Sequence, residues 1–424
     1  MTASADGPPP AAPAKASPRF GGASAILIAT VIAGGLTYLL QAVVLAALSD
    51  VEYLQYSIVW SVLYLVVGAL AGIQQEVSRA TVVVAPGAPH PRGSVTGRFA
   101  ATAAVVAFVV FVVAGLFWAP DTIRTDPVLI VVLVGAGAAS YVFVAALSGT
   151  LYGLHRWIVL AWMITIDAAL RAIFVAVGAW TGSSLLVLVV AMVLPFPLSI
   201  AATWLIVRSS IRGRTRLDVG FRGLAWNASR TVVGSAATAI MVSGFPFLLG
   251  VTSPGQPVAA AAVIAVVTLT RAPLVIPVLA MQSFLVVYFR DNSARLGRTL
   301  VTILGGVAIV TAIAALLAWW IGPEVLHWFG KDFPISAWEI ALIVASAGAT
   351  AALCVTGPAT LARNDHVGFT TGWVIAALLV VGALLLPLDP AVKSAVALCV
   401  GPLVGLATHL FFLGRNRGRR PAAV

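Results

Sequence analysis

The sequence predicts an all-α, polytopic membrane protein of about twelve transmembrane helices, arranged as two six-helix bundles around a central cavity. Composition is the first observation, because 61% of the 424 residues are hydrophobic and only 9% are charged. The second is that apolar stretches of about 20 residues, the length that crosses a bilayer, recur along almost the whole chain. The third is that Lys and Arg gather in alternate loops.

The apolar segments are separated by short polar interruptions, none of which outside the membrane is long enough to fold as a domain. In order, they are 24–48, 54–73, 99–117, 128–147, 157–177, 183–207, 231–249, 258–288, 300–320, 338–361, 369–386 and 391–413. Because their number is even, both termini are expected on the same side of the membrane.

The basic residues predict which side that is. Of the 25 Lys and Arg residues, 20 fall in the tails and the loops of one set, whereas the opposite set holds only Arg124, Lys331 and Lys393. Positively charged loops stay on the cytoplasmic side, so both termini are predicted to be cytoplasmic in a multi-pass protein of the cytoplasmic membrane. The net charge of +11 is thereby explained by membrane-flanking loops, without a nucleic-acid partner.

An internal repeat divides the chain into two halves. The stretch SGTLYGLHR from Ser148 resembles TGPATLAR from Thr356, an offset of 208 residues, and the first and seventh segments start 207 residues apart. We therefore expect parallel pseudo-repeats, with bundles at 24–207 and 231–413 and a substrate path between them. An Arg-rich cytoplasmic linker, 208–230, separates the bundles. A Pro- and Ala-rich tail, 1–23, is expected to be disordered, and a basic tail, 414–424, ends the chain.

Four stretches carry a resemblance to a known family. They are LSDVEYLQYSIVWSVLYLVVGALAGIQQEVSRA, ALSGTLYGLHRW, TRAP at 270–273, and IGPEVLHWFGKDFPISAW. In order and position they resemble the polysaccharide-precursor flippases of the multidrug/oligosaccharidyl-lipid/polysaccharide exporter superfamily, over about residues 24–413. The resemblance implies a V of two bundles that opens alternately to each side. It also implies transport of an undecaprenyl- or decaprenyl-linked glycan from the inner to the outer leaflet.

Polar residues inside the apolar segments are the candidate substrate-binding residues, because charged and hydroxyl-rich groups need polar partners in hydrocarbon. Arg271 is the first candidate, since a guanidinium binds phosphate bidentately. Asp167 and Arg171 stand at i and i+4 on one helical face, where they form either a structural pair or part of the site. Gln41 and Gln282 are further candidates, although intramembrane amides commonly join helices.

Other functions make different demands on the sequence. A multidrug exporter of the same fold needs acidic, cation-binding residues in the cavity. A polyprenyl-phosphate-dependent glycosyltransferase needs a carboxylate pair on its first external loop, where Asp50 and Glu52 stand, but the external loops are short. A scaffold in a cell-envelope complex is the remaining alternative. Transport without catalysis is the favoured prediction.

No cofactor or metal site is predicted, because Cys354 and Cys399 both fall inside apolar segments. The expected partners are the lipid-linked glycan and membrane lipids. Cell-envelope glycosyltransferases or a polymerase are the candidate protein partners. The sequence leaves open the sugar, the lipid carrier, the driving force and the oligomeric state.

Overall fold

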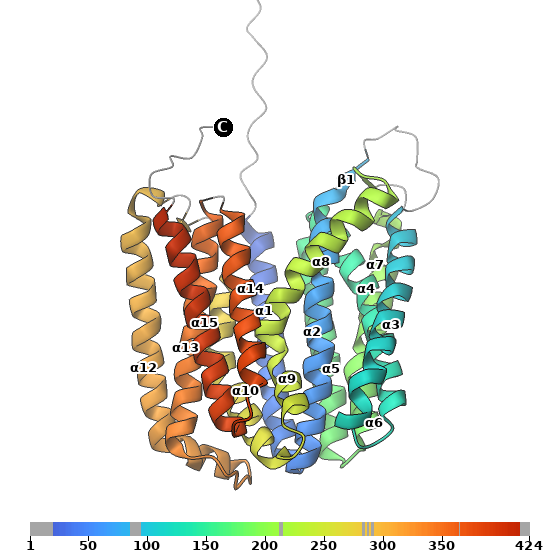
Figure 1. The fold of residues 1–424 in the computed structure, drawn as a ribbon. Helices are drawn as coiled ribbons and strands as arrows, with labels where there is room; N and C mark the ends of the chain where they lie inside the picture. The colour runs from blue at the N-terminus through green and yellow to red at the C-terminus, as the bar shows by residue number, and fades with distance from the viewer. Residues whose placement is uncertain are drawn as a thin grey trace, which may run out of the picture.

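The computed structural model describes residues 20–84, 95–211, 215–281, 285, 288–289, 292–363 and 365–415, and it confirms the all-α membrane architecture (Figure 1). The predictions for tail residues 1–19 and 416–424 lie outside this range. The first-half helices are α1 Phe20–Ala47, α2 Asp50–Ala80, α3 Val95–Thr122, α4 Pro127–Gly153, α5 Trp157–Trp180, α6 Leu185–Val193 and α7 Pro195–Ile211. The later helices are α8 Phe221–Ser243, α9 Phe245–Thr252, α10 Pro257–Ala280, α12 Leu296–Trp328, α13 Ala337–Leu361, α14 His366–Leu384 and α15 Pro390–Arg415, with a 3₁₀ turn at Ser293–Arg295.

Within the described residues, ten spans are long and apolar enough to cross a membrane, and the bent pair α8–α9 makes eleven. α6 and α7 together form one of these spans, interrupted at Leu194 just before Pro195. α10 takes the place of the eighth predicted segment, whose end lies partly outside the described residues. The side chains of α3 and α12 are mostly exposed and apolar, which fits helices that face lipid. The chain is therefore a multi-pass membrane protein.

Two groups of helices form the bundles. In the first half α1 packs against α5, and α4 packs against both α2 and α3. In the second half α13 packs against α10, α12 and α15, and α14 packs against α15. The start of α1 and the end of α15 lie at the same end of the molecule (Figure 1, top). We call this end the terminal side, and the sequence predicts that it is cytoplasmic.

The seventh predicted segment departs from a simple division into halves. α8 packs chiefly against α2 of the first half and makes a smaller contact with α14 (Figure 1). Glycines on α2 permit this approach, because a Cβ at Gly72 would lie 2.5 Å from the backbone of Thr231, and one at Gly68 would lie 2.7 Å from Ala239 Cβ. The hydroxyl of Thr231 also donates to the Gly72 carbonyl at 2.9 Å. α8 thus ties the second half of the sequence to the first bundle.

The linker predicted at 208–230 is largely built into regular structure. α7 continues to Ile211, the strand β2 Thr215–Leu217 follows, and α8 begins at Phe221. β2 pairs antiparallel with β1 Thr81–Val83, which directly follows α2, with Val82 opposite Arg216. Arg79 also contacts Asp218 at 3.2 Å. The linker is ordered because pairing of β1 with β2 gives their backbone N–H and C=O groups hydrogen-bond partners within the protein.

Candidate functional site

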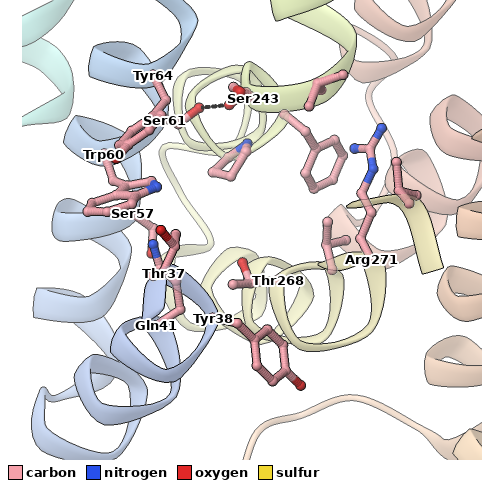
Figure 2. A pocket seen from close by; sticks show the side chains of 15 residues that line it. Thr37, Tyr38, Gln41, Ser57, Trp60, Ser61, Tyr64, Ser243, Thr268 and Arg271 are labelled. Atoms are coloured by element: carbon pink, nitrogen blue, oxygen red, sulfur yellow. Dashed lines mark hydrogen bonds between the residues drawn. The ribbon is translucent and has the colours of Figure 1, made fainter. Parts of the chain in front are cut away.

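A cavity of about 270 Å³ lies where the two halves meet (Figure 2). Side chains of α1, α2, α10 and the α8–α9 junction form its wall. The lining residues are Thr37, Tyr38, Gln41, Ser57, Trp60, Ser61, Tyr64, Val242, Ser243, Phe245, Pro246, Val267, Thr268, Arg271 and Val275. These residues come from both halves of the sequence, as the predicted path between the repeats requires.

The α2 wall of the cavity combines hydroxyl and aromatic groups. Ser57, Trp60, Ser61 and Tyr64 follow the spacing i, i+3, i+4 and i+7, which places them on one helical face. Their rings form a stack that begins one turn earlier at Tyr56, with ring centroids 5.8 Å apart between Tyr56 and Trp60 and 4.5 Å apart between Trp60 and Tyr64. Of this stack, Trp60 and Tyr64 line the cavity, whereas Tyr56 is buried.

The opposite wall carries the cation. Arg271 and Thr268 of α10 lie across the cavity from Trp60 and Ser57 (Figure 2). Arg271 is only 9% exposed, and Gln41 of α1, which lines the same cavity, is 8% exposed. The Tyr38 hydroxyl donates to the Leu269 carbonyl at 3.0 Å and so fixes α1 against α10. Among the described residues that line the cavity there is no Asp or Glu, so its fixed charge is positive.

The α8–α9 junction forms one boundary of the cavity. α8 and α9 meet at a bend of 67°. The Ser61 hydroxyl donates to the Ser243 carbonyl and accepts from the Phe247 N–H at 3.1 Å, so one α2 side chain serves two backbone groups freed by the bend. Pro246, near the start of α9, has no N–H to continue the α8 ladder. The bend is therefore encoded by local sequence and held by α2.

A second cavity, of about 660 Å³, lies toward the terminal side between α2, α8, α13 and α14. It shares Val242 and Ser243 with the first cavity. Gln75 of α2 and Trp373 of α14 are among its polar lining residues. The two cavities thus succeed one another along the interface between the halves, and they meet at the α8–α9 junction.

The Asp167 and Arg171 side chains form an ion pair within the first bundle, and neither lines the cavity. Arg171 is 2% exposed and donates to Asp167 Oδ2 and, at 2.7 Å, to the Met192 carbonyl. Its guanidinium also lies 4.3 Å from the Phe196 ring centroid and 5.7 Å from that of Tyr64. Since Tyr64 does line the cavity, the pair stands directly behind the α2 wall. Its predicted transport role remains a prediction.

The structure thus brings Arg271 and Gln41 together in one cavity and places Asp167 and Arg171 behind it. The prediction for Gln282 lies outside the described residues. The α2 wall was not predicted from the sequence, because the candidates in the apolar segments were charged and amide side chains. The spacing of Ser57, Trp60, Ser61 and Tyr64 was the available signal.

The two carboxylates that the glycosyltransferase alternative needs have structural contacts. Glu52 closes a capping box with Ser49 at the start of α2. Asp50 accepts from Lys331 Nζ at 3.1 Å, and the same ammonium donates to the Leu48 carbonyl at the end of α1. Lys393 makes a similar contact, donating to the Thr252 carbonyl at the end of α9. Two of the three basic residues on the predicted external side therefore cap helix C-termini.

Comparison with solved structures establishes the fold. An inward-facing multidrug resistance MATE family transporter of the MOP superfamily superimposes with a TM-score of 0.60 at 14% identity, covering 93% of this chain and all of that one. An outward-facing form gives 0.59 at 15% identity, covering 93% and 95%. A MOP superfamily transporter from Pyrococcus furiosus Vc1 (DSM3638), described as having a binding pocket of reverse polarity, gives 0.58 at 14%, covering 94% and 96%. The fold that the resemblance implied is thus the fold observed.

The fold, with a cavity between its two halves, defines a multi-pass membrane protein of the MATE type of architecture. No family model matches the sequence. The uncharacterized protein Rv1510 of Mycobacterium tuberculosis (strain ATCC 25618 / H37Rv) is 32% identical over 376 residues, covering 85% of this chain and 84% of the relative. Rv3630 of the same strain is 31% identical over 377 residues with the same coverage. The chain belongs to the family of these mycobacterial proteins.

Proposed function

We propose that this protein flips a polyprenyl-(pyro)phosphate-linked glycan precursor from the inner to the outer leaflet of the cytoplasmic membrane by alternating access. The observation that carries the proposal is the buried Arg271 side chain in the wall of a cavity between the two halves. A charged side chain at membrane depth is costly to keep and marks a functional site by default. Its planar fork suits phosphate oxygens, with which it forms charge-assisted, bidentate hydrogen bonds.

The rest of the cavity supports a glycan next to that phosphate. Thr37, Gln41, Ser57, Ser61 and Thr268 supply hydroxyl and amide groups within a largely apolar wall. A sugar loses several kcal/mol of hydration free energy, of order 2–7 per group, when hydroxyls leave water without partners. Hydrogen-bonding groups inside the cavity offset this loss, and the lipid tail needs no such help because it stays in hydrocarbon.

The charge of the cavity argues against the multidrug alternative. A cation exporter needs a carboxylate to bind its cargo or coupling ion, and the described lining residues include none. The Pyrococcus furiosus transporter of the same fold is described as having a pocket of reverse polarity that suggests a different function. This fold is therefore not tied to cationic drugs, which leaves the positive cavity as the better guide to the cargo.

A transport assay in proteoliposomes tests the proposal. The protein is reconstituted with a polyprenyl-pyrophosphate glycan in the inner leaflet, and an impermeant lectin reports sugar that reaches the outer leaflet. We expect Arg271→Ala to lower the transport rate by about tenfold or more, and Arg271→Lys to restore it only in part, because lysine lacks the bidentate fork. Loss of a buried charge does not hinder membrane insertion, so protein yield should stay normal.

The matched control is Arg298→Ala, which removes an exposed arginine near the start of α12. Its transport rate should equal that of the unmodified protein. Equal rates for Arg271→Ala and the unmodified protein would remove the guanidinium from the mechanism. Transport of a cationic drug driven by a proton or sodium gradient, without transport of the glycan, would establish the multidrug alternative instead.

A further inference from the structure

The α2 wall of the cavity is built differently from the arginine wall. Its centre is Trp60, which stacks between Tyr56 and Tyr64 at interplanar angles of 28° and 24°. Figure 2 shows the nitrogen edge of the Trp60 indole turned toward the cavity, beside Ser57 and Thr37. Within the described part of the chain, no group accepts a hydrogen bond from that indole N–H. The wall thus offers an apolar ring and a donor at one place.

Two further polar groups near Trp60 have no hydrogen-bond partner in the described residues. The Ser57 hydroxyl is buried beside the Tyr53 hydroxyl, and no described group meets it in hydrogen-bonding geometry. The Gln41 amide, 8% exposed, lines the same cavity from α1 and likewise makes no hydrogen bond with a described group. A buried polar group without a partner loses its hydration without compensation, so such groups are rare unless water or a ligand satisfies them. Their convergence on one cavity indicates a ligand that carries several hydroxyl or amide groups.

The position of Arg271 indicates how that ligand is oriented in the cavity. Arg271 lies across the cavity from Trp60 (Figure 2), on α10 of the second half, whereas Trp60, Ser57 and Gln41 all belong to the first half. An anionic group held by Arg271 therefore leaves the neighbouring part of the same molecule against the α2 wall. That part meets one aromatic ring, an indole donor, a hydroxyl and an amide, a set of partners that matches the alternating apolar and hydroxyl surface of a sugar.

The buried ion pair behind this wall has a place in the same arrangement. Arg171 is held by Asp167 and by the Met192 carbonyl, and its guanidinium lies over the Tyr64 ring. Tyr64 in turn stacks on Trp60 with ring centroids 4.5 Å apart. Arg171 thus fixes the Tyr64 ring from behind, and Tyr64 fixes the angle of the indole.

We infer that the α2 wall, centred on Trp60 with Ser57 and Gln41, is the saccharide subsite of the cavity and determines which first sugar is accepted, with Arg171 as its positioning residue. This inference rests on the proposed function, because it assigns the sugar and the phosphate of one cargo to opposite walls. The cargo then joins the two halves, with its phosphate on the second half and its first sugar on the first half.

Binding to the full-length protein in detergent, measured by calorimetry with two probes, tests the inference. The probes are farnesyl pyrophosphate carrying one N-acetylhexosamine and farnesyl pyrophosphate without sugar. We expect Trp60→Ala to weaken binding of the sugar-bearing probe by about tenfold, the usual cost of losing an aromatic anchor, and to change binding of the sugar-free probe less than about twofold. Trp60→Phe, which keeps a ring but loses the donor, should fall between.

The matched control is Trp162→Ala, which removes an exposed tryptophan of α5 and should leave both affinities unchanged. Arg171→Met should lower the preference for the sugar-bearing probe over the sugar-free one, a ratio that a purely structural role would not move. Arg271→Ala, by contrast, should weaken binding of both probes together, because both carry the pyrophosphate.

The outcomes separate the inference from the proposed function. If neither probe binds the unmodified protein, the proposed function fails and the inference fails with it. If both probes bind, but Trp60→Ala weakens them equally or not at all, the saccharide subsite is wrong while the phosphate role of Arg271 stands. If hexose, N-acetylhexosamine and pentose probes bind the unmodified protein equally, the wall does not select the sugar, and that part of the inference is overturned.

Discussion

The ion pair of Asp167 and Arg171 illustrates how single residues are constrained in this membrane fold. Arg171 is buried to 2% exposure, whereas the Asp167 side chain is 23% exposed and receives a weak contact from Ser199 at 3.4 Å. Arg171 therefore relies more on its counter-ion to stabilise its charge than Asp167 does, because the carboxylate has some contact with solvent. Removing either partner leaves a charge in a poorly solvated place, but the cost differs between them.

A double-mutant comparison of thermal stability in detergent measures this difference. Asp167→Ala should be the least stable variant, by roughly 3–5 kcal/mol, because it leaves the buried guanidinium without its counter-ion. Arg171→Ala should lose less, since the carboxylate that it leaves behind is more exposed than the guanidinium. The double variant should be more stable than Asp167→Ala, because it strands no charge. A double variant whose loss equals the sum of the two single losses would show that the residues do not interact.

At this scale the sequence predicted part of the site. Arg271 and Gln41 stood out because polar side chains are rare in apolar segments, and the i,i+4 pairing of Asp167 with Arg171 follows from helix geometry alone. Trp60 and Ser57 did not stand out, because a tryptophan or serine costs little in a membrane helix and is common there. Their role depends on which face of α2 meets α1 and α10, and that is a property of helix packing that one chain's pattern does not contain.

At the scale of elements, α8 and α9 show a break that the hydropathy pattern hides. The apolar run 231–249 predicted one continuous helix, but the structure bends at Gly244. A Cβ at Gly244 would lie 2.7 Å from the Ile240 carbonyl oxygen and 2.9 Å from Leu65 Cδ1. Mean hydropathy is averaged over a window of residues, so it does not reveal this contact. The sequence Gly244, Phe245, Pro246 was the local signal for a bend. The extent of each span was thus predictable, but its straightness was not.

Gly244→Ala tests the close approach at this bend. The added methyl group should destabilise the protein by about 1–3 kcal/mol, because the Ile240 carbonyl belongs to the backbone and cannot move aside. Gly306→Ala in α12 is the control, since nothing lies within 4 Å of its added Cβ, and it should be neutral or slightly stabilising, by up to about 1 kcal/mol. Thermal unfolding in detergent measures both. Equal stability of the two variants would contradict the packing described at Gly244.

At the scale of the whole molecule, Lys331 joins the two halves at the side opposite the termini. It belongs to the connection between α12 and α13, is 8% exposed, and contacts both the end of α1 and the start of α2. Lys393 is buried in the same way, but its contact with Thr252 stays within the second half of the sequence. The two lysines therefore differ in whether they resist separation of the halves.

Accessibility of the cavity from outside the cell tests this difference. In a protein whose Cys354 and Cys399 are replaced by alanine, a cysteine at Thr37 reports whether an impermeant thiol reagent reaches the cavity. Lys331→Met should raise the external labelling rate several-fold. The Lys331 contacts stabilise the conformation that is closed on the external side, so their loss shifts the population toward the conformation that is open on that side. Lys393→Met should leave the rate unchanged. Faster labelling from the cytoplasmic face instead would overturn both the expected role of Lys331 and the predicted orientation.

The packing of α8 against α2 affects how the protein folds during synthesis. Helices α1 to α7 leave the ribosome before α8 does. Until α8 is made, the face of α2 around Gly68 and Gly72 therefore lies in the translocation machinery or in lipid without α8 packed against it. The first six membrane crossings therefore do not form a finished unit by themselves. Although the sequence predicts two repeated halves, the nascent chain reaches its final packing only when the second half has begun to emerge.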